Sequence, residues 1–330
     1  TYALSESGPA NYTASAWVCV GGTQNGSNVT VGLGESATCT ITNDDNAPSL
    51  TLIKSVTNDN GGTSLTGAWT LTATGPTGFS GAGPSVSNGA SFNAGTYTLS
   101  ESGPSGYTQS NWVCVGTGEQ TGSNVVALEL GESATCTITN NDIAPSLTLV
   151  KHVTNDNGGT AVATDWTLTA TGPTTISGAG GVSSEAGFSA GTYTLSESGG
   201  PSGYTASDWS CVKNNDAPIT DSSITLGLND TAVCTITNDD NAPALHLRKV
   251  VITDNGGTAT ETDWTLSAAG PTPLSGTTPV DSGASFDQGT YALSESGPAN
   301  YTASAWVCVG GTQNGSNVTV GLGESATCTI

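Results

Sequence analysis

The sequence contains very few positively charged residues. Five Lys and Arg stand against 27 Asp and Glu, which gives the 330-residue chain a formal net charge of −22. Such a surface repels nucleic acid and anionic membranes. The chain also lacks any run of eighteen apolar residues, so no segment is expected to insert into a membrane. These absences argue against nucleic acid and the bilayer interior as partners.

Residues that catalyse reactions of an external substrate are equally scarce. Only two histidines occur, His152 and His246, and strand alternation places both at outward positions. No Ser-His-Asp set or metal cluster forms around them. No Gly-rich phosphate loop lies between a strand and a helix. The sequence therefore predicts a protein that is not an enzyme.

The chain is instead built from tandem repeats. The phrase APSLTLIK at 47–54 returns as APSLTLVK at 144–151 and as APALHLRK at 242–249. Residues 1–41 are identical to residues 290–330. This identity suggests either a recent duplication or one period plus an overlap from a longer periodic protein.

Each repeat has the signals of a β domain. Gly and Pro turn residues separate short β-branched runs, and about 100 residues is the usual size of a two-sheet sandwich. We therefore predict an all-β fold of tandem Ig-like β-sandwich domains. The predicted parts are a C-terminal piece of a sandwich at 1–46, whole sandwiches at 47–143 and 144–241, and a sandwich truncated before its last strand ends at 242–330.

The predicted linkers are short. They cover residues 43–48, 140–145 and 238–243, and each contains a proline. A short connection with proline has little conformational freedom. We therefore expect neighbouring domains to stack as a stiff linear rod.

The eight cysteines fall in four pairs, one pair per repeat. None has the CxxC spacing of a zinc site. We interpret the pairs as disulfides rather than free thiols, which implies an oxidising compartment. The predicted disulfides join Cys19 to Cys39, Cys114 to Cys136, Cys211 to Cys234, and Cys308 to Cys328.

Three polar residues of each whole repeat lie in phase with the apolar core positions. Side chains alternate between the two faces of a strand. Lys54 therefore shares a face with Leu50 and Leu52, and Glu101 and Asn140 likewise share faces with apolar neighbours in their own strands. A buried Lys or Glu without a partner is costly. The three polar side chains should therefore meet inside the domain.

Two interpretations of this set remain open from the residues. The first is a buried Lys–Glu ion pair with Asn as a hydrogen-bonding neighbour. The second is a covalent Lys–Asn amide. Burial would lower the Lys pKa and raise the Glu pKa, giving a neutral amine nucleophile and a neutral acid that shuttles protons. The amine would attack the carboxamide once, within the fold, and ammonia would leave.

The arrangement resembles the prealbumin-like (SpaA and CnaB type) domains of bacterial surface proteins and pilins. Those domains carry a Lys in the first strand, a Glu in a phrase like YxLxExxxPxGY, and an Asn or Asp at the end of the last strand. Residues 193–204, YTLSESGGPSGY, match the phrase in full, and residues 97–107, YTLSESGPSGY, are one residue shorter. The resemblance covers the whole chain and implies a prealbumin-like fold, although the family pattern does not include the paired cysteines.

The resemblance also assigns candidate isopeptide residues. They are Lys54, Glu101 and Asn140 in one repeat; Lys151, Glu197 and Asn238 in the next; Lys249 and Glu295 in the third; and Glu6 and Asn43 in the first segment.

Calcium is the one cofactor that the sequence suggests, and none is required. The linker phrase TNDDNAP is similar to the DxNDNxP linkers that bind calcium between cadherin domains. Calcium takes six to eight oxygen ligands, which Asp44, Asp45 and Asp59 would help to supply. The alternative to a calcium site is that these Asp, Asn and Gly residues are simply the ordinary residues of turns.

These observations predict a structural extracellular protein at a bacterial cell surface. It would form a stiff fibre, stalk or adhesin shaft whose domains are locked by disulfides and, under the second interpretation of the buried polar set, also by Lys–Asn amides. The expected partners are the protein itself and a host or neighbouring cell surface. The alternative is an adhesive module that recognises host protein or glycan through outward loops, for which the divergent loop 212–216 is the main sequence signal.

Overall fold

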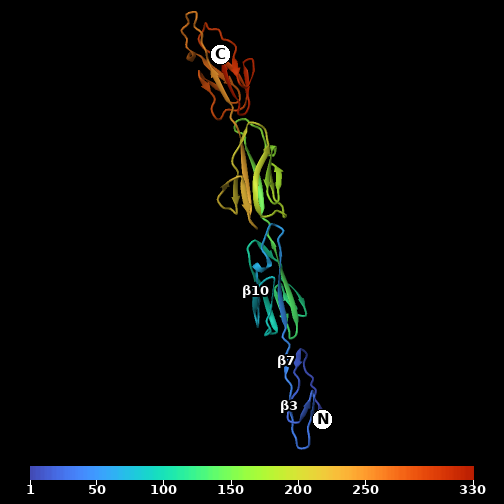
Figure 1. Ribbon diagram of the computed structural model, residues 1–330. Coiled ribbons are helices and arrows are strands. Elements are labelled where there is room, and N and C mark those ends of the chain that lie inside the picture. The colour runs from blue at the N-terminus through green and yellow to red at the C-terminus, as the bar shows by residue number, and fades with distance from the viewer. The chain divides into compact units, whose positions relative to one another are not determined.

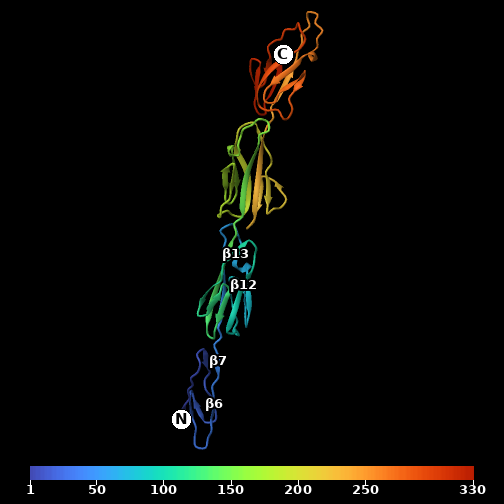
Figure 2. The ribbon, with the colours of Figure 1, turned by 180° about the vertical axis from the view of Figure 1, so that it is seen from behind.

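The computed structural model describes residues 1–330 and confirms the predicted all-β fold. Figures 1 and 2, seen from opposite sides, show strands in every part of the chain. The helical segments are three short 3₁₀ turns: η1 (Thr66–Ala68), η2 (Ala163–Asp165) and η3 (Glu261–Asp263). None of them has the length or hydropathy to cross a membrane. The chain divides into two compact units, Thr1–Ile143 and Ala144–Ile330.

The first unit contains one complete sandwich. One sheet has the order β11-β8-β17-β13, with β14 also paired to β17, and the other has the order β10-β9-β12-β16-β15. Their strands are β8 (Ser49–Thr57), β9 (Thr70–Thr74), β10 (Phe79–Ala82), β11 (Ser85–Ser87), β12 (Gly95–Ser102), β13 (Tyr107–Gln109), β14 (Val113–Gly116), β15 (Glu119–Gly122), β16 (Val125–Leu128) and β17 (Ser133–Asp142).

The core of this sandwich follows from strand alternation. Along β8, Leu50, Leu52 and Lys54 are buried while the residues between them are partly exposed. Strand β8 runs parallel to β17, and Lys54 lies opposite Ile138 in the register. The first and last strands of the repeat are therefore neighbours in the middle of one sheet. Tyr97 from the facing sheet closes the core.

The second unit contains two sandwiches of the same kind. The strands of the first are β18 (Ser146–Thr154), β19 (Trp166–Thr171), β20 (Ile176–Ala179), β21 (Gly181–Ser183), β22 (Gly191–Gly199), β23 (Tyr204–Ala206), β24 (Ser210–Lys213), β25 (Ile219–Thr220), β26 (Ser223–Leu226) and β27 (Thr231–Asp240). Its sheets have the orders β21-β18-β27-β24-β25, with β23 also on β27, and β20-β19-β22-β26.

The strands of the second are β28 (Ala244–Arg248), β29 (Thr265–Ala269), β30 (Leu274–Thr277), β31 (Val280–Asp281), β32 (Gly289–Ser296), β33 (Val307–Val309), β34 (Thr312–Asn314), β35 (Asn317–Val320) and β36 (Ser325–Thr329). Its sheets have the orders β31-β28-β36-β33 and β30-β29-β32-β35-β34. In both sandwiches the first and last strands pair in parallel, as β8 and β17 do.

Residues 1–46 form three small sheets without a closed core. They are β1-β5-β4, β2-β7 and β3-β6. The strands are β1 (Tyr2–Ala3), β2 (Tyr12–Ala14), β3 (Val18–Val20), β4 (Thr23–Asn25), β5 (Asn28–Thr30), β6 (Thr38–Thr40) and β7 (Asn43–Asp45). Val29 is the one hydrophobic residue of this segment that is fully buried. Two-stranded and three-stranded pieces of this size cannot enclose a core by themselves.

The connections between repeats are shorter than the sequence predicts. The segments 140–145 and 238–243 begin as strand, because β17 continues to Asp142 and β27 continues to Asp240. Only residues 241–243 then separate β27 from β28. The reason is that Asp142 and Asp240 are buried and hydrogen-bonded inside their own repeats.

Candidate functional site

Each whole repeat buries a lysine against a glutamate of the facing sheet. Lys54 Nζ on β8 lies 2.8 Å from Glu101 Oε2 on β12, and the two side chains are 0% and 4% exposed. Neither Lys54 Nζ nor Glu101 Oε2 has a further hydrogen-bond partner besides this ion pair. The pair therefore crosses the interior of the sandwich with incomplete compensation for its burial.

The same pair recurs in the second unit. Lys151 Nζ donates a hydrogen bond to Glu197 Oε2 at 2.9 Å, and Lys249 Nζ donates one to Glu295 Oε2 at 2.7 Å. Both glutamates are more exposed than Glu101, at 17% and 11% of the side chain. The structure thus brings together the Lys and Glu candidates of all three repeats.

The candidate asparagines lie on the strand beside the lysine. Ile138 faces Lys54 across the parallel pair, and Asn140 follows two residues later on the same face. Asn140 and its counterpart Asn238 are 4% and 3% exposed, and the Oδ1 atom of each has no hydrogen-bond partner. A buried carboxamide oxygen without a partner costs about 1–3 kcal/mol. This arrangement favours a chemical event that uses the carboxamide.

The incomplete first segment shows that Glu and Asn also meet. There Asn43 Nδ2 donates a hydrogen bond to Glu6 Oε2 at 3.1 Å, and both residues are exposed. No lysine of this segment competes for the glutamate. The glutamate therefore contacts lysine in three repeats and asparagine in the incomplete first segment, as expected if it lies between the two.

A tryptophan that sequence reasoning did not single out covers each lysine. The rings of Trp69, Trp166 and Trp264 lie 4.8, 4.8 and 4.7 Å from the Nζ atoms of the lysines in their own repeats. A cation is attracted to the face of an indole ring, while the ring itself excludes water from the amine. The signal in the sequence was the phrase WTL, which occurs once in every repeat that carries the lysine.

Burial lowers the pKa of two of these lysines. Burial lowers the pKa of Lys54 below its ordinary value, and the contact with Glu101 opposes this change without cancelling it. The pKa of Lys151 is lowered for the same reason and is opposed by Glu197. A lower pKa increases the share of neutral amine, which is the form that acts as a nucleophile.

A disulfide links two neighbouring strands in each part of the array. The structure joins Cys19 to Cys39, Cys114 to Cys136, Cys211 to Cys234, and Cys308 to Cys328. In every case the two cysteines lie directly opposite each other on antiparallel strands. The last strand of each whole or nearly whole repeat is thereby bound to a second strand besides the first.

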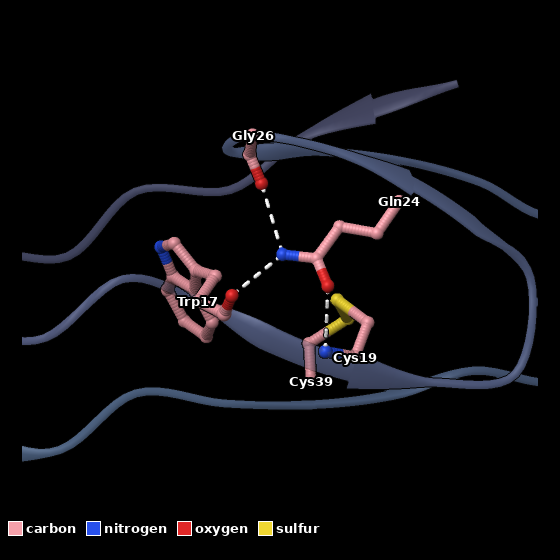
Figure 3. Close-up of a disulfide and its surroundings, with 5 residues drawn as sticks. All are labelled: Trp17, Cys19, Gln24, Gly26 and Cys39. Atoms are coloured by element: carbon pink, nitrogen blue, oxygen red, sulfur yellow. Dashed lines mark hydrogen bonds between the residues drawn. A yellow bond between two sulfur atoms is a disulfide. The ribbon is translucent and has the colours of Figure 1, made fainter.

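A glutamine lies against each of three disulfides, and sequence reasoning also missed it. Figure 3 shows the first example, in which the Gln24 side chain reaches over the strand that carries Cys19. Gln24 Oε1 accepts a hydrogen bond from the Cys19 N–H, and Gln24 Nε2 donates to the carbonyls of Trp17 and Gly26. Gln120 and Gln313 make the same contacts in their repeats.

A buried carboxylate organises the loop that follows the first strand. Asp142 at the end of β17 accepts hydrogen bonds from the N–H groups of Asp59, Asn60 and Gly62 at 2.7–3.0 Å. Burial by itself would raise the pKa of Asp142, but these N–H groups together outweigh burial and hold the pKa below its ordinary value. Asp240 makes equivalent bonds in the next repeat.

The residues predicted to bind calcium do not come together. Asp44 and Asp45 lie on β7, paired with β2, whereas Asp59 is held by Asp142 in a loop of the following repeat. The physical reason is that Asp142 and Asp240, the counterparts of Asp45, bind a loop of their own repeat and not a loop of the following one. The single group of three close acidic side chains consists of Asp156, Asp239 and Asp240.

We predict that the Asp142 loop is sensitive to acid. Because the folded pKa of Asp142 lies below 3.8, its ionised form stabilises the fold fully above about pH 4. This stabilisation is lost as the pH falls through 3.8 and then through the lower folded pKa. Asp142→Asn should remove this dependence and also destabilise the loop at pH 7, because its Nδ2 opposes the N–H donors.

The measurement is hydrogen exchange of the Gly62 amide as a function of pH. Asp44→Asn, an exposed aspartate on β7, is the control and should leave the profile unchanged. An unchanged acid profile in Asp142→Asn would show that another group controls the loop.

Comparison with known proteins gives a family match along almost the whole chain. A model described as a prealbumin-like fold domain matches residues 1–41, 45–138, 142–236 and 240–330. A search of curated proteins finds no match.

Several solved structures are similar at low sequence identity. The Bacillus anthracis TIE protein is 14% identical over 90% of this chain and 53% of its own, with a TM-score of 0.48. The major pilin protein T-13 of Streptococcus pyogenes is 12% identical over 58% of this chain and 97% of its own, with a TM-score of 0.30. The pilus adhesin SpaC of Lactobacillus rhamnosus GG is 14% identical over 92% of this chain and 45% of its own, with a TM-score of 0.27. The chain spans about half the length of the first and the third of these proteins.

Proposed function

The chain belongs to the prealbumin-like fold domain family, and from this premise we propose that it is a structural protein of the bacterial cell surface, forming a fibre or stalk. The observation that carries the proposal is that the same buried ion pair and the same disulfide recur from repeat to repeat. Every whole repeat buries the same Lys–Glu pair beside its first and last strands, and each has one disulfide on the last strand. Features that recur in every repeat are expected to stabilise each domain of the tandem array and not to form one ligand-binding site.

The proposed division into domains follows the repeats, at 47–143, 144–241 and 242–330, with 1–46 as a partial domain. Separate hydrophobic cores lie within the first three of these ranges. The short proline-containing joints support a stiff fibre. The disulfides support an extracellular position, because such bonds persist in oxidising compartments. The proposed partners are further copies or further repeats of the same protein, and we assign no cofactor.

We propose further that Lys and Asn become covalently linked in each complete repeat. The neutral Nζ of Lys54 attacks the Asn140 carboxamide carbon, a new C–N bond forms, and the bond from that carbon to Nδ2 breaks. Glu101 accepts the proton from Nζ and delivers it to the departing nitrogen, which leaves as ammonia. The short Lys54–Glu101 contact, the Trp69 cover and the unpartnered Asn140 oxygen support this step.

The proposed Lys–Asn amide would join the two strands through which a pulling force passes into and out of a repeat. Force applied along the chain enters a repeat near its first strand and leaves near its last. A bond from Lys54 to Asn140 joins these two strands and bypasses everything between them. The same geometry holds for Lys151 and Asn238 in the next repeat. The proposed function is therefore resistance to extension rather than turnover of a substrate.

Intact mass spectrometry of the reduced, denatured chain tests the covalent link. Two amides should lower the mass by about 34 Da, because each loses one ammonia of about 17 Da. Glu101→Gln should restore about 17 Da relative to its own expected mass, with Glu197 left in place as the internal control. A chain with the full calculated mass would leave only buried ion pairs and would contradict the covalent part of the proposal.

A further inference from the structure

In the repeats at 47–143 and 242–330, the strand that carries the first cysteine of the disulfide has an open outer edge. On its inner side, β14 pairs with β17, and Cys114 lies directly opposite Cys136. On its outer side no strand follows, and β33 is likewise the last strand of its sheet. An unpaired edge presents N–H and C=O groups that can pair with another chain.

A side-chain amide occupies these groups. Gln120 Oε1 accepts a hydrogen bond from the Cys114 N–H at 2.9 Å, and Gln120 Nε2 donates to the Trp112 carbonyl at 2.8 Å. The remaining Nε2 proton goes to the Gly122 carbonyl at 3.0 Å. The Gln120 side chain thus pairs with one N–H and one C=O group of the strand edge, as a neighbouring strand would. Both protons of its Nε2 are used in hydrogen bonds.

The contact is kept even where the spacing changes. Gln24 and Gln313 follow their cysteines by five residues, whereas Gln120 follows Cys114 by six. The β15–β16 hairpin of this repeat also has a shift in register, between Gln120 and Gly122. Three of the five glutamines of the chain are used in this way. The glutamine contact therefore forms with two different loop lengths, so it does not depend on the conformation of one particular turn.

The repeat at 144–241 has no glutamine at this place, and there a strand closes the edge instead. The divergent segment after Cys211 folds back as β25, where Ile219 pairs with Cys211 and Thr220 with Ser210. The chain itself therefore shows that this edge accepts an antiparallel strand. The glutamine amide and the strand are alternative ways to close it.

The edges closed by glutamine are suited to pairing between chains. Val113 and Val115 are 61% and 66% exposed, and Val307 and Val309 are 63% and 76% exposed. Neither strand carries a charged residue, so the strong negative charge of the chain does not act at the contact itself. β-branched, uncharged edges are the ones that associate. Two identical edges can pair antiparallel about a two-fold axis.

We propose that Gln24, Gln120 and Gln313 are edge latches, glutamines whose side-chain amides prevent the disulfide strand from pairing with the same strand of a second copy of the chain. The latches keep neighbouring fibres separate along their sides. This role is independent of whether the Lys–Asn amide forms, because no latch residue contacts the lysine, glutamate or asparagine.

The test is Gln120→Ala in the full chain, with Gln109→Ala as the matched control. Gln109 is an exposed glutamine on β13 of the same sandwich. In Gln120→Ala the Cys114 amide should exchange with solvent about tenfold faster, because it has lost its acceptor. The variant should also form a dimer in a concentration-dependent way, seen by sedimentation velocity, while the control stays monomeric.

A second substitution identifies the surface that pairs. Val113→Lys in the Gln120→Ala background should abolish the dimer, because two like charges would face each other across the paired edges. Gln313→Ala tests the same role in another repeat and decides the matter if Gln120→Ala does not fold. A folded Gln120→Ala that stays monomeric, or a dimer that persists with Val113→Lys, would overturn the proposal.

Discussion

Replacing Asn140 with alanine is expected to let the repeat at 47–143 extend under force by on the order of 20 nm. In the unmodified chain the proposed Lys54–Asn140 amide closes a loop of roughly 86 residues, which cannot lengthen. Without the amide only the segment between Cys114 and Cys136, a separation of 22 residues, stays bypassed by the disulfide. The other residues, about 64 at roughly 3.3–3.6 Å each, become available to extension.

Asn140→Ala is a sharper variant than a change at Lys54. Removing the lysine would strand Glu101 inside the sandwich and destabilise the repeat with or without an amide. Asn140→Ala leaves the Lys54–Glu101 pair intact, and it removes a carboxamide oxygen that has no hydrogen-bond partner. If only an ion pair exists, the substitution should therefore cost little.

Single-molecule force spectroscopy of the full chain makes the measurement. The repeat at 144–241, with Asn238 unchanged, is the internal control and should not extend. Under reducing conditions the Asn140→Ala extension should lengthen further, because the disulfide no longer bypasses its loop. If the unmodified chain already unfolds with the same extension as the variant, the amide does not form.

Loss of the disulfide in the same repeat should be the second large effect. Replacing Cys114 and Cys136 together with alanine is expected to lower the free energy of unfolding by about 3 kcal/mol, from the greater chain entropy of the unfolded state. Cys136 is fully buried in the middle of its sheet, between the strands of Leu52 and Cys114, so lost packing adds to the effect. The unfolding midpoint should fall by more than about 10 °C.

Hydrogen exchange of peptides from 47–143 during thermal or denaturant unfolding would report this change. The control is the paired replacement of Cys19 and Cys39, because residues 1–46 enclose no core that would unfold cooperatively. Equal stability of the repeat with and without Cys114 and Cys136 would mean that the first and last strands hold it without the cross-link.

The fold class was accessible from the sequence because its signals are local. Gly and Pro turns, β-branched runs and a repeat near 100 residues all act over a few positions or recur along the chain. Strand alternation was enough to place Lys54, Glu101 and Asn140 on core-facing sides, where the structure also has them. Such a face is determined by the period of two along a strand and does not require the partner strand to be known.

The partners of these residues depended on contacts between distant strands. Trp69 over Lys54 and Asp142 in the Asp59 loop carry no spacing rule, since each joins segments that only the tertiary fold brings together. Gln120 is only six residues from Cys114, but its role depends on the open edge of the sheet. The calcium hypothesis joined Asp44 and Asp45 to Asp59 of the following repeat for the same reason, whereas the acidic group that forms, Asp156 with Asp239 and Asp240, has the same repeat positions within a single repeat. Local composition could not tell a ligand set from an aspartate that binds backbone N–H groups.

The identical segments 1–41 and 290–330 distinguish what the sequence determines from what the tertiary structure determines. The sequence by itself determined that both have the same cysteine pair, the same pairing of the two cysteine strands and the same glutamine contact. Tyr2 is nevertheless 65% exposed while Tyr291 is completely buried. Only the tertiary structure decided this, because residues 242–289 supply the strands that cover Tyr291, and an apolar face becomes a core only when another sheet packs against it.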